Sequence, residues 1–330
     1  MTIYDIAKEA GVSPSSVSRV VNGKPGVNRV NRKIIEDLLK KYDYLPNETA
    51  RGLVTKKTGL VGILVKDIRS QHLIEGTHFI VNRLNKYGYP TMIINAGDTD
   101  EDMTQSLIRL RQHSIEALIM MGSMFQTEAV RKAVTRYCRN IPVFMMNGYF
   151  ELPNVYGVLS DEMRGVTRCV QILAENGKKN IVFLVDKPTQ SSHMKERGFL
   201  EGLEQIGLNT EDAVIYRMVD QSLAGGLEAM VEVLREHPET NGVICSQDII
   251  ACGAVNAIRE RGMKVPEDIA VIGTDNSVYA EICYPKLTSL DNMITDACDM
   301  IVSKLLDVMD GIETSKRVVL KSSVIKRASA

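Results

Sequence analysis

The chain is poor in aromatic residues and contains no tryptophan. Phe, Tyr and Trp together make up 5% of its 330 residues. Large aromatic faces are the usual stacking platforms for ring-shaped ligands, so a site of that kind is weakly supported. Long apolar stretches are missing as well, and the longest are only as long as a strand. We therefore expect no export signal, no membrane partner and a cytoplasmic location.

Groups that carry catalysis or bind metals are also sparse. There is no Gly-x-Ser-x-Gly elbow, no phosphate loop and no Gly-x-Gly-x-x-Gly opening a helix. The five histidines pair with neither Cys nor carboxylates at the spacing of a zinc site: His72, His78, His113, His193 and His237. The sequence therefore predicts no enzyme, no metal and no cofactor.

The six cysteines are few, scattered and without a Cys-x-x-Cys motif. They lie in apolar or helical surroundings, at Cys138, Cys169, Cys245, Cys252, Cys283 and Cys298. Neither a disulfide framework nor a redox motif of that type is indicated, and buried reduced thiols are the expectation.

What the chain does have is a helix-turn-helix pattern at its N-terminus. Thr2, Ser13 and Asn28 each stand where a helix cap is expected, and Pro14 suits the first position of the second helix. Gly11 suits the tight turn between the first two helices. The second helix of such a pair enters the DNA major groove. The apolar faces are predicted to be Ile3, Ile6, Ala7 and Ala10, then Val17, Val20 and Val21, then Val30, Ile34, Ile35, Leu38 and Leu39.

Charge separates this segment from an ordinary small helical bundle. Up to Thr58 the chain has eleven Lys and Arg residues against six Asp and Glu residues, a net charge of +5. The whole chain has a formal net charge of −1, so the remainder carries −6. A basic arm on an acidic body is typical of a DNA-binding protein.

The segment Tyr44-Leu45-Pro46-Asn47-Glu48-Thr49-Ala50-Arg51-Gly52-Leu53 follows, and here the resemblance becomes specific. The chain resembles the LacI/GalR family of bacterial transcription regulators over essentially its whole length. The resemblance implies a hinge that becomes helical on the operator, with Leu53 wedged into the minor groove. The candidate DNA contacts are Thr2, Tyr4, Ser13, Ser15, Ser16, Ser18, Arg19, Asn22, Asn28, Asn47, Ala50, Arg51 and Leu53.

The body alternates apolar, β-rich runs with amphipathic helical stretches. Apolar runs without alternation indicate strands buried on both faces, and hence parallel sheets flanked by helices. Strands are predicted at 60–65, 91–94, 117–120, 143–146, 155–159, 181–185, 242–246, 269–273 and 289–291. Helices are predicted at 73–87, 102–113, 165–175, 221–236 and 252–261, among others.

The predicted fold is an all-α helix-turn-helix headpiece followed by an α/β, two-lobed, periplasmic-binding-protein-like effector domain. We place the headpiece at 1–46, the hinge at 47–58 and the effector-binding and dimerisation domain at 59–330. The resemblance implies that lobe 1 comprises about 60–159 and 291–318, and that lobe 2 comprises about 160–290 and 319–330. The predicted partners are double-stranded operator DNA, a second copy of the chain and a small-molecule effector.

Open parallel sheets bind ligands beyond the carboxyl ends of their strands, so the effector is expected there. Lys195 stands where the family usually carries Arg, whose planar guanidinium group can form two parallel hydrogen bonds. The neighbouring Arg197 is therefore a candidate to supply that group instead. Asn147 and Gln247 have an alternative role in satisfying backbone groups, and Asp275 has one as a cap. The candidate effector contacts are Ile68, His72, Leu73, Asn147, Lys195, Arg197, Gln221, Gln247 and Asp275.

These features predict a sequence-specific repressor whose operator affinity is set by a sugar or sugar derivative bound between the lobes. A purine-type co-repressor is the alternative effector. A stand-alone sugar-binding protein is a further alternative, but it needs an export signal and no headpiece. The sequence leaves open the identity of the effector, its sign of action, the operator sequence, the regulated genes and any association beyond a dimer.

Overall fold

The computed structural model describes residues 1–44, 58–218 and 220–330. The chain divides into two compact units, Met1–Thr58 and Gly59–Ala330, and each is considered by itself. No helix among the described residues is both long enough and apolar enough to cross a membrane.

The first unit is a bundle of three helices, α1 (Ile3–Ala10), α2 (Pro14–Val21) and α3 (Arg29–Lys41). Their starting points follow the predicted caps. Thr2 and Asp5 form a reciprocal capping box, while the side chains of Ser13 and Asn28 accept backbone N–H groups of α2 and α3. A small core of Ile6, Ala7, Val17, Val20 and Ile35 holds the bundle together.

The apolar stripe predicted for α3 is wrong at two positions. Val30 is 69% exposed and Ile34 is 41% exposed, whereas Ile35 is fully buried and Leu38 and Leu39 are partly buried. A helix that contacts two short neighbours buries only the narrow face turned toward them, and Val30 and Ile34 lie beside that face.

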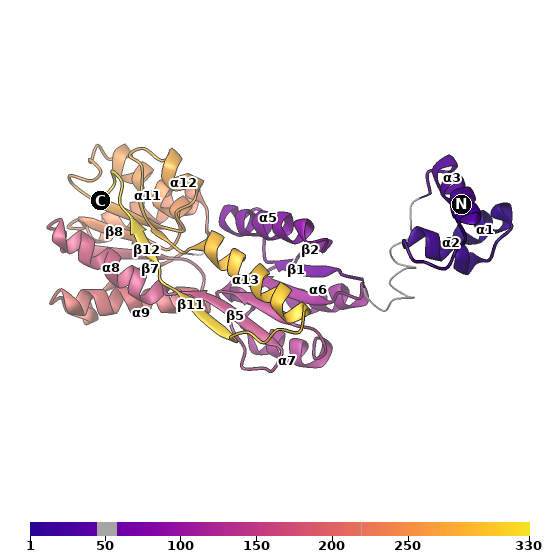
Figure 1. The fold of residues 1–330 in the computed structure, drawn as a ribbon. Helices are drawn as coiled ribbons and strands as arrows, with labels where there is room; N and C mark the ends of the chain where they lie inside the picture. The colour runs from indigo at the N-terminus through magenta and orange to yellow at the C-terminus, as the bar shows by residue number, and fades with distance from the viewer. Residues whose placement is uncertain (45–57, 219) are drawn as a thin grey trace. The chain divides into compact units, whose positions relative to one another are not determined.

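The first sheet of the second unit has six parallel strands in the order β11-β5-β4-β3-β1-β2. Helices α5 and α13 pack on one face of this sheet, and α6 and α7 pack on the other (Figure 1). The strands are β1 (Val61–Val65), β2 (Thr91–Asn95), β3 (Ala117–Met121), β4 (Val143–Met146), β5 (Val155–Ser160) and β11 (Arg317–Leu320). The helices are α5 (Gln71–Lys86), α6 (Asp100–Gln112), η1 (Ser123–Phe125), α7 (Glu128–Tyr137) and α13 (Ile294–Met309).

The second sheet repeats this plan in the order β12-β10-β9-β8-β6-β7, with β12 antiparallel to β10. Helices α10, α11 and α12 cover one face, and α8 and α9 cover the other. The strands are β6 (Ile181–Val185), β7 (Val214–Arg217), β8 (Gly242–Cys245), β9 (Ala270–Thr274), β10 (Thr288–Asp291) and β12 (Ser323–Ile325). The helices are α8 (Glu162–Glu175), α9 (Gln190–Gln205), η2 (Thr210–Asp212), α10 (Leu223–Glu236), α11 (Asp248–Glu260) and α12 (Val278–Ile282).

Alternate strand residues enter different cores, as expected for sheets covered on both faces. In β1, Val61 and Ile63 pack beneath α5 and α13, whereas Leu64 packs beneath α6 and α7. The predicted fold class, a helical headpiece followed by a two-lobed α/β domain, is therefore confirmed. All nine predicted strands are present, and no strand end differs from its prediction by more than one residue.

Three connections join the two lobes, after β5, after β10 and after β11. They lie together: the Asp161 N–H donates to the Leu320 carbonyl at 2.8 Å, and the Ser160 hydroxyl donates to the Asn292 carbonyl. The last connection follows Leu320, beyond the boundary expected at 318, because β11 pairs with β5 along its whole length.

Candidate functional site

The exposed side of α2 offers hydroxyl, amide and guanidinium groups to solvent. Ser15 and Arg19 are exposed and Ser16 and Ser18 are partly exposed, while Val17 and Val20 turn into the core. This side is free to meet base edges and phosphates. Asn22, at the end of the helix, is exposed and donates through Nδ2 to the Ser18 carbonyl at 2.7 Å, so its amide oxygen is available as an acceptor.

Several candidate DNA contacts also have structural tasks. The Ser13 hydroxyl is 2.8 Å from that of Ser15 and 3.0 Å from that of Ser16, while it also caps α2. Thr2 and Asn28 cap α1 and α3 in the same way. Tyr4 is 68% exposed and has no such role. The remaining candidates, Asn47, Ala50, Arg51 and Leu53, lie outside the described residues.

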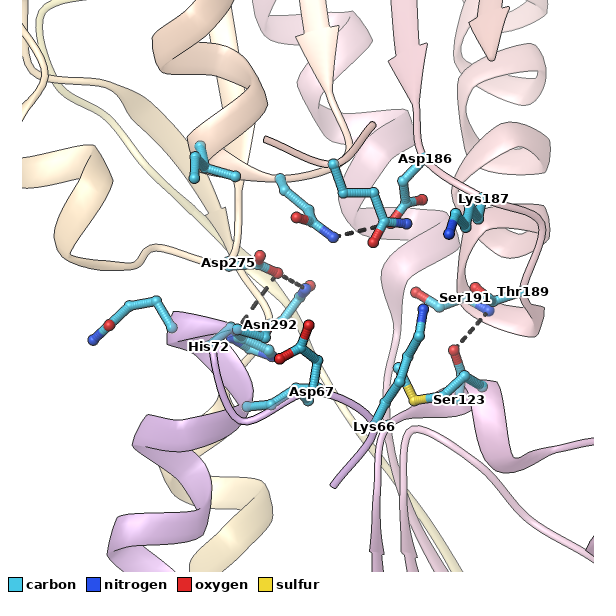
Figure 2. Close-up of a pocket in the computed structure, with 18 of the residues that line it drawn as sticks. Lys66, Asp67, His72, Ser123, Asp186, Lys187, Thr189, Ser191, Asp275 and Asn292 are labelled. Atoms are coloured by element: carbon cyan, nitrogen blue, oxygen red, sulfur yellow. Dashed lines mark hydrogen bonds and ion pairs between the residues drawn. The ribbon is translucent and has the colours of Figure 1, made fainter. Parts of the chain in front are cut away.

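A cavity of about 500 Å³ lies between the two lobes of the second unit. It is bordered by the loops that follow the carboxyl ends of β1, β3, β4, β6, β8 and β9, where open parallel sheets bind ligands (Figure 2). Seven of the nine residues predicted to contact an effector line it: His72, Leu73, Asn147, Lys195, Gln221, Gln247 and Asp275.

The other two candidates, Ile68 and Arg197, do not line the cavity. Ile68 is 49% exposed, and Arg197 is exposed on α9. Residues two apart on a helix point in nearly opposite directions, so Arg197 turns outward because Lys195 turns inward. The prediction that Arg197 takes over the effector contact of the family's usual Arg is therefore wrong.

Lys195 is the buried cation of this cavity. Its Nζ lies 3.4 Å from Glu162 Oε1 and donates to the Ser246 carbonyl at 3.1 Å, and both charged side chains are 6% exposed. Burial alone lowers the pKa of Lys195, but the carboxylates of Glu162, Asp275 and Asp186 outweigh it and raise the pKa overall. Lys195 is therefore a fixed positive charge in the cavity wall.

Asp275 faces Lys195 from the loop after β9. Its Oδ1 accepts from Asn292 Nδ2 at 2.9 Å and lies 3.9 Å from His72 Nδ1, which belongs to the other lobe (Figure 2). Burial raises the pKa of Asp275 to about 7, although Lys195 opposes the rise. The backbone of Asp275 has a φ of 103°, a conformation that residues other than glycine rarely adopt. The loop thus holds this carboxyl in place at a local cost in strain.

His72 is neutral at physiological pH. Burial, together with the nearby charge of Lys195, lowers its pKa to about 4. A neutral imidazole offers one donor and one acceptor, so His72 suits a hydroxyl group better than an anion.

Asp186 and Gln247 form a pair on the second lobe, with Gln247 Nε2 donating to Asp186 Oδ2 at 3.0 Å. Burial raises the pKa of Asp186, whereas Lys195 and Gln247 lower it. Asp248, the next residue, accepts from Ser289 at 2.6 Å and from both the backbone and the hydroxyl of Ser277. These bonds hold α11 against the loop after β9, so Asp248 has a structural role.

Asn147 also has a structural role. Its Oδ1 accepts the Ser160 N–H at 2.8 Å, and its φ of 50° shows a tight left-handed turn. This bond satisfies a backbone group at the first connection between the lobes, as the alternative interpretation of Asn147 predicts. The residue also lines the cavity.

Sequence reasoning missed Glu162, Asp186 and Asn292, which complete the polar wall around Lys195 and Asp275. Asp186 directly follows β6, so the rule on strand ends points to it. Glu162 opens α8 and Asn292 lies in the second connection, and no local pattern marks either. Among the described residues, no group of three or more His, Cys, Asp or Glu is arranged to hold a metal ion.

Two family models match the chain. One describes a periplasmic binding protein-like domain and matches residues 170–330, and the other describes bacterial regulatory proteins of the lacI family and matches residues 2–47. An HTH-type transcriptional regulator of Lachnoclostridium phytofermentans is 28% identical over 330 residues, covering 99% of this chain and 98% of the relative.

Solved structures share the fold over the whole chain. A lac repressor dimer bound to operator and the anti-inducer ONPF has a TM-score of 0.89 at 23% identity, covering 100% of this chain and 98% of the other. The cellobiose complex of the transcriptional regulator CelR has a TM-score of 0.74 at 22% identity, covering 100% of both chains.

Proposed function

This chain is a DNA-binding transcriptional regulator of the lacI family, not an enzyme, and we propose that a hydroxyl-rich small molecule in the cavity between its lobes sets its affinity for an operator. The lac repressor, whose fold this chain shares, binds its operator as a dimer. A dimer of this chain carries two headpieces, which suits a pseudo-palindromic operator. A regulator that binds a bacterial chromosome works in the cytoplasm, and we assign that location to this protein.

The character of the cavity wall carries the proposal for the effector. Seven Asp and Glu residues and four Lys and Arg residues line it, together with amides and hydroxyls. Adjacent hydroxyls of a sugar can donate two hydrogen bonds to one carboxylate, and charge-assisted bonds are the stronger kind. Among the described lining residues, only His72 and Tyr279 have aromatic rings, so a flat purine meets few stacking surfaces. A sugar or sugar derivative is therefore our proposal, and a purine is the alternative.

The proposed coupling is a shift between two arrangements of the lobes. A ligand that touches Asp275 on one lobe and His72 on the other favours the arrangement in which both reach it. That preference can change operator affinity only by the difference in ligand affinity between the two arrangements. The three neighbouring connections are where the lobes turn relative to each other.

A thermal-shift screen of neutral sugars, sugar phosphates and nucleobases tests the effector class. A ligand at a hundred times its dissociation constant stabilises the folded state by about 2.7 kcal/mol. A hit among the sugars should lose most of its effect in Asp275→Asn. A hit confined to nucleobases, or one unaffected by Asp275→Asn, contradicts the proposal.

The headpiece is tested with Arg19→Ala and a matched control, Lys33→Ala, which removes a cation from α3 instead of α2. With duplexes selected from a random pool, we expect Arg19→Ala to lose about 1–3 kcal/mol of specific binding. Lys33→Ala should lose less, and both should keep the thermal shift with the effector. Equal losses in a gel-shift titration would show that α2 supplies charge and no sequence readout.

The contacts proposed for the hinge rest on the family resemblance and need their own test. Leu53→Ala removes the apolar side chain that is proposed to open a base step, so bending of the operator should fall together with affinity. Gel mobility of circularly permuted duplexes measures the bend. An unchanged bend would rule out the wedge.

A further inference from the structure

One of the cysteines, Cys283, does not fit the expectation of buried thiols. Cys138, Cys169, Cys245 and Cys298 are fully buried, and burial raises their pKa values, to about 12 for Cys138, Cys169 and Cys298. Cys283, in contrast, is only partly buried, at the end of α12. A thiol must be reachable and partly ionised to react, and four of the six thiols are neither.

Cys252 lies beside Cys283, although the two are far apart in the sequence. Cys252 is on α11, is 6% exposed and belongs to the core against which Cys283 packs. Both residues bond to one oxygen: Cys252 Sγ donates to the Tyr279 carbonyl at 3.5 Å, and the Cys283 N–H donates to the same carbonyl at 3.0 Å. The single hydrogen of the Cys252 thiol is shared between this carbonyl and the neighbouring Cys283 sulfur.

The surroundings favour a thiolate at Cys283 and a thiol at Cys252. The hydrogen bond from Cys252 lowers the pKa of Cys283 against the effect of burial, and the Tyr284 N–H and Arg259 lower it further. The same hydrogen bond, together with burial, raises the pKa of Cys252. Arg259 is held nearby, since its Nη1 donates to the Tyr284 carbonyl at 3.2 Å.

We propose that Cys283 and Cys252 are a peroxide-oxidised thiol pair, with Cys283 as the reacting sulfur and Cys252 as the resolving one. The Cys283 thiolate attacks one oxygen of hydrogen peroxide and becomes a sulfenic acid, and hydroxide leaves. The Cys252 thiol then condenses with the sulfenic acid, forming the disulfide and releasing water. Two electrons pass from the two sulfurs to the peroxide, and thiol reductants reverse the change.

Oxidation of this pair changes the hydrogen bonding of one residue that lines the effector cavity, Tyr279. Tyr279 lines the cavity and its carbonyl accepts the Cys252 thiol. Disulfide formation removes that hydrogen, so the carbonyl loses a donor and α12 is tied to α11 covalently.

The test is treatment of the full-length reduced protein with a small molar excess of hydrogen peroxide, followed by intact mass measurement and peptide mapping. The wild type should lose the mass of two hydrogen atoms, yield one cross-linked peptide joining Cys252 to Cys283, and recover its mass with dithiothreitol. No reaction, a cross-link between other cysteines, or a sulfinic acid at Cys283 without a disulfide would overturn the proposal.

Variants separate the two roles. Cys252→Ser should stop at a Cys283 sulfenic acid that dimedone traps, Cys283→Ser should react no faster than the buried thiols, and the matched control Cys169→Ser should behave as the wild type. Alkylation by iodoacetamide across pH gives a second measurement, in which Cys283 should react first and at the lowest pH. Circular dichroism of each variant confirms that it folds. Equal alkylation midpoints for Cys283 and Cys252 would also overturn the assignment.

Discussion

The two lobes line the cavity with charged side chains of different kinds. In the first lobe, Lys66 lies 3.0 Å from Asp98, which is 68% exposed, and Arg69 lies 2.7 Å from Asp67 while being 87% exposed itself. In the second lobe, Lys195 and Glu162 are each 6% exposed, and Asp275 is 12% exposed. In each first-lobe pair one partner lies largely in water and screens the pair, whereas both partners of the Lys195–Glu162 pair are shielded from water.

The difference indicates how the lobes share the work of binding. Charges that are already buried and hydrogen-bonded do not need to reorganise when a ligand arrives, so they fix which groups it must present. Exposed pairs exchange partners with little cost and give little selectivity. We infer that the second lobe selects the ligand and that the first lobe closes over it.

The largest expected effect comes from breaking the buried pair. Lys195→Met leaves Glu162 charged and buried, which should cost about 3–5 kcal/mol of unfolding free energy. Arg69→Met breaks the exposed pair with Asp67 in the first lobe and should cost about 0–1 kcal/mol. Urea unfolding measures both. The double variant Lys195→Met with Glu162→Gln should recover much of the loss, and no recovery would mean that packing, not charge, supports this wall.

The second-largest effect is expected in the pH dependence of stability, which should differ between variants of the two lobes. The folded-state pKa of Asp275 is about 7, above its ordinary value of 3.8, so the folded protein holds a proton that the unfolded chain releases between these values. Stability therefore falls as pH rises through this window. Asp275→Asn should gain stability relative to the wild type from pH 4 to 7, by up to about 1.4 kcal/mol for each pH unit.

Asp67→Asn is the matched control in the first lobe. Hydrogen bonds from Arg69 lower the pKa of Asp67 to about 2, so its contribution is complete above pH 4 and is lost as pH falls toward 2. Relative to the wild type, this variant should show no slope between pH 4 and 7. A slope in both variants would contradict the contrast between the walls.

Ligand affinity should be lost unequally as well. With the sugar identified by screening, Asp275→Asn should weaken binding by about 1.5–3 kcal/mol, as expected for a lost charge-assisted hydrogen bond. Asp67→Asn should weaken it by less than about 1 kcal/mol, since Asp67 bonds to Arg69 in solvent. Calorimetric titration gives both values. A greater loss in Asp67→Asn would assign selection to the first lobe.

The smallest effect is expected where the walls touch. The Ser191 N–H on the second lobe donates to the Ser123 hydroxyl on the first at 3.3 Å (Figure 2). Ser123→Ala should change the unfolding free energy by about 1 kcal/mol or less, because the bond is long and neutral. A greater change would show that the first lobe contributes more to closure than its exposed charges indicate.

The sequence predicts the parts of this protein that local patterns control. The caps at Thr2, Ser13 and Asn28 are confirmed, since each depends on a side chain and a backbone group three residues away. Uninterrupted apolar runs located the central strands. The strands β7, β11 and β12 were not predicted, because they lie at or near sheet edges where exposed and covered residues mix.

The second wall of the cavity was harder to predict, because its members meet only in three dimensions. Asp275 and Gln247 follow strands and were found by that rule, but their partner Lys195 was identified through the family resemblance. Its ion-pair partner, Glu162, comes from the start of another helix. The direction in which Lys195 and Arg197 point depends on how α9 packs, and burial decides the neutral state of His72. Pairing and pKa follow from packing, which no window of sequence contains.

The order in which the sheets are completed has a consequence for synthesis on the ribosome. Strand β11 closes the edge of the first sheet beside β5, and β12 follows at once to close the edge of the second beside β10. Until both have emerged, the largely buried strands β5 and β10 are the outer strands of their sheets, and unpaired apolar edges invite pairing with other chains. The two sheets therefore gain their last strands almost together, from residues 317–325.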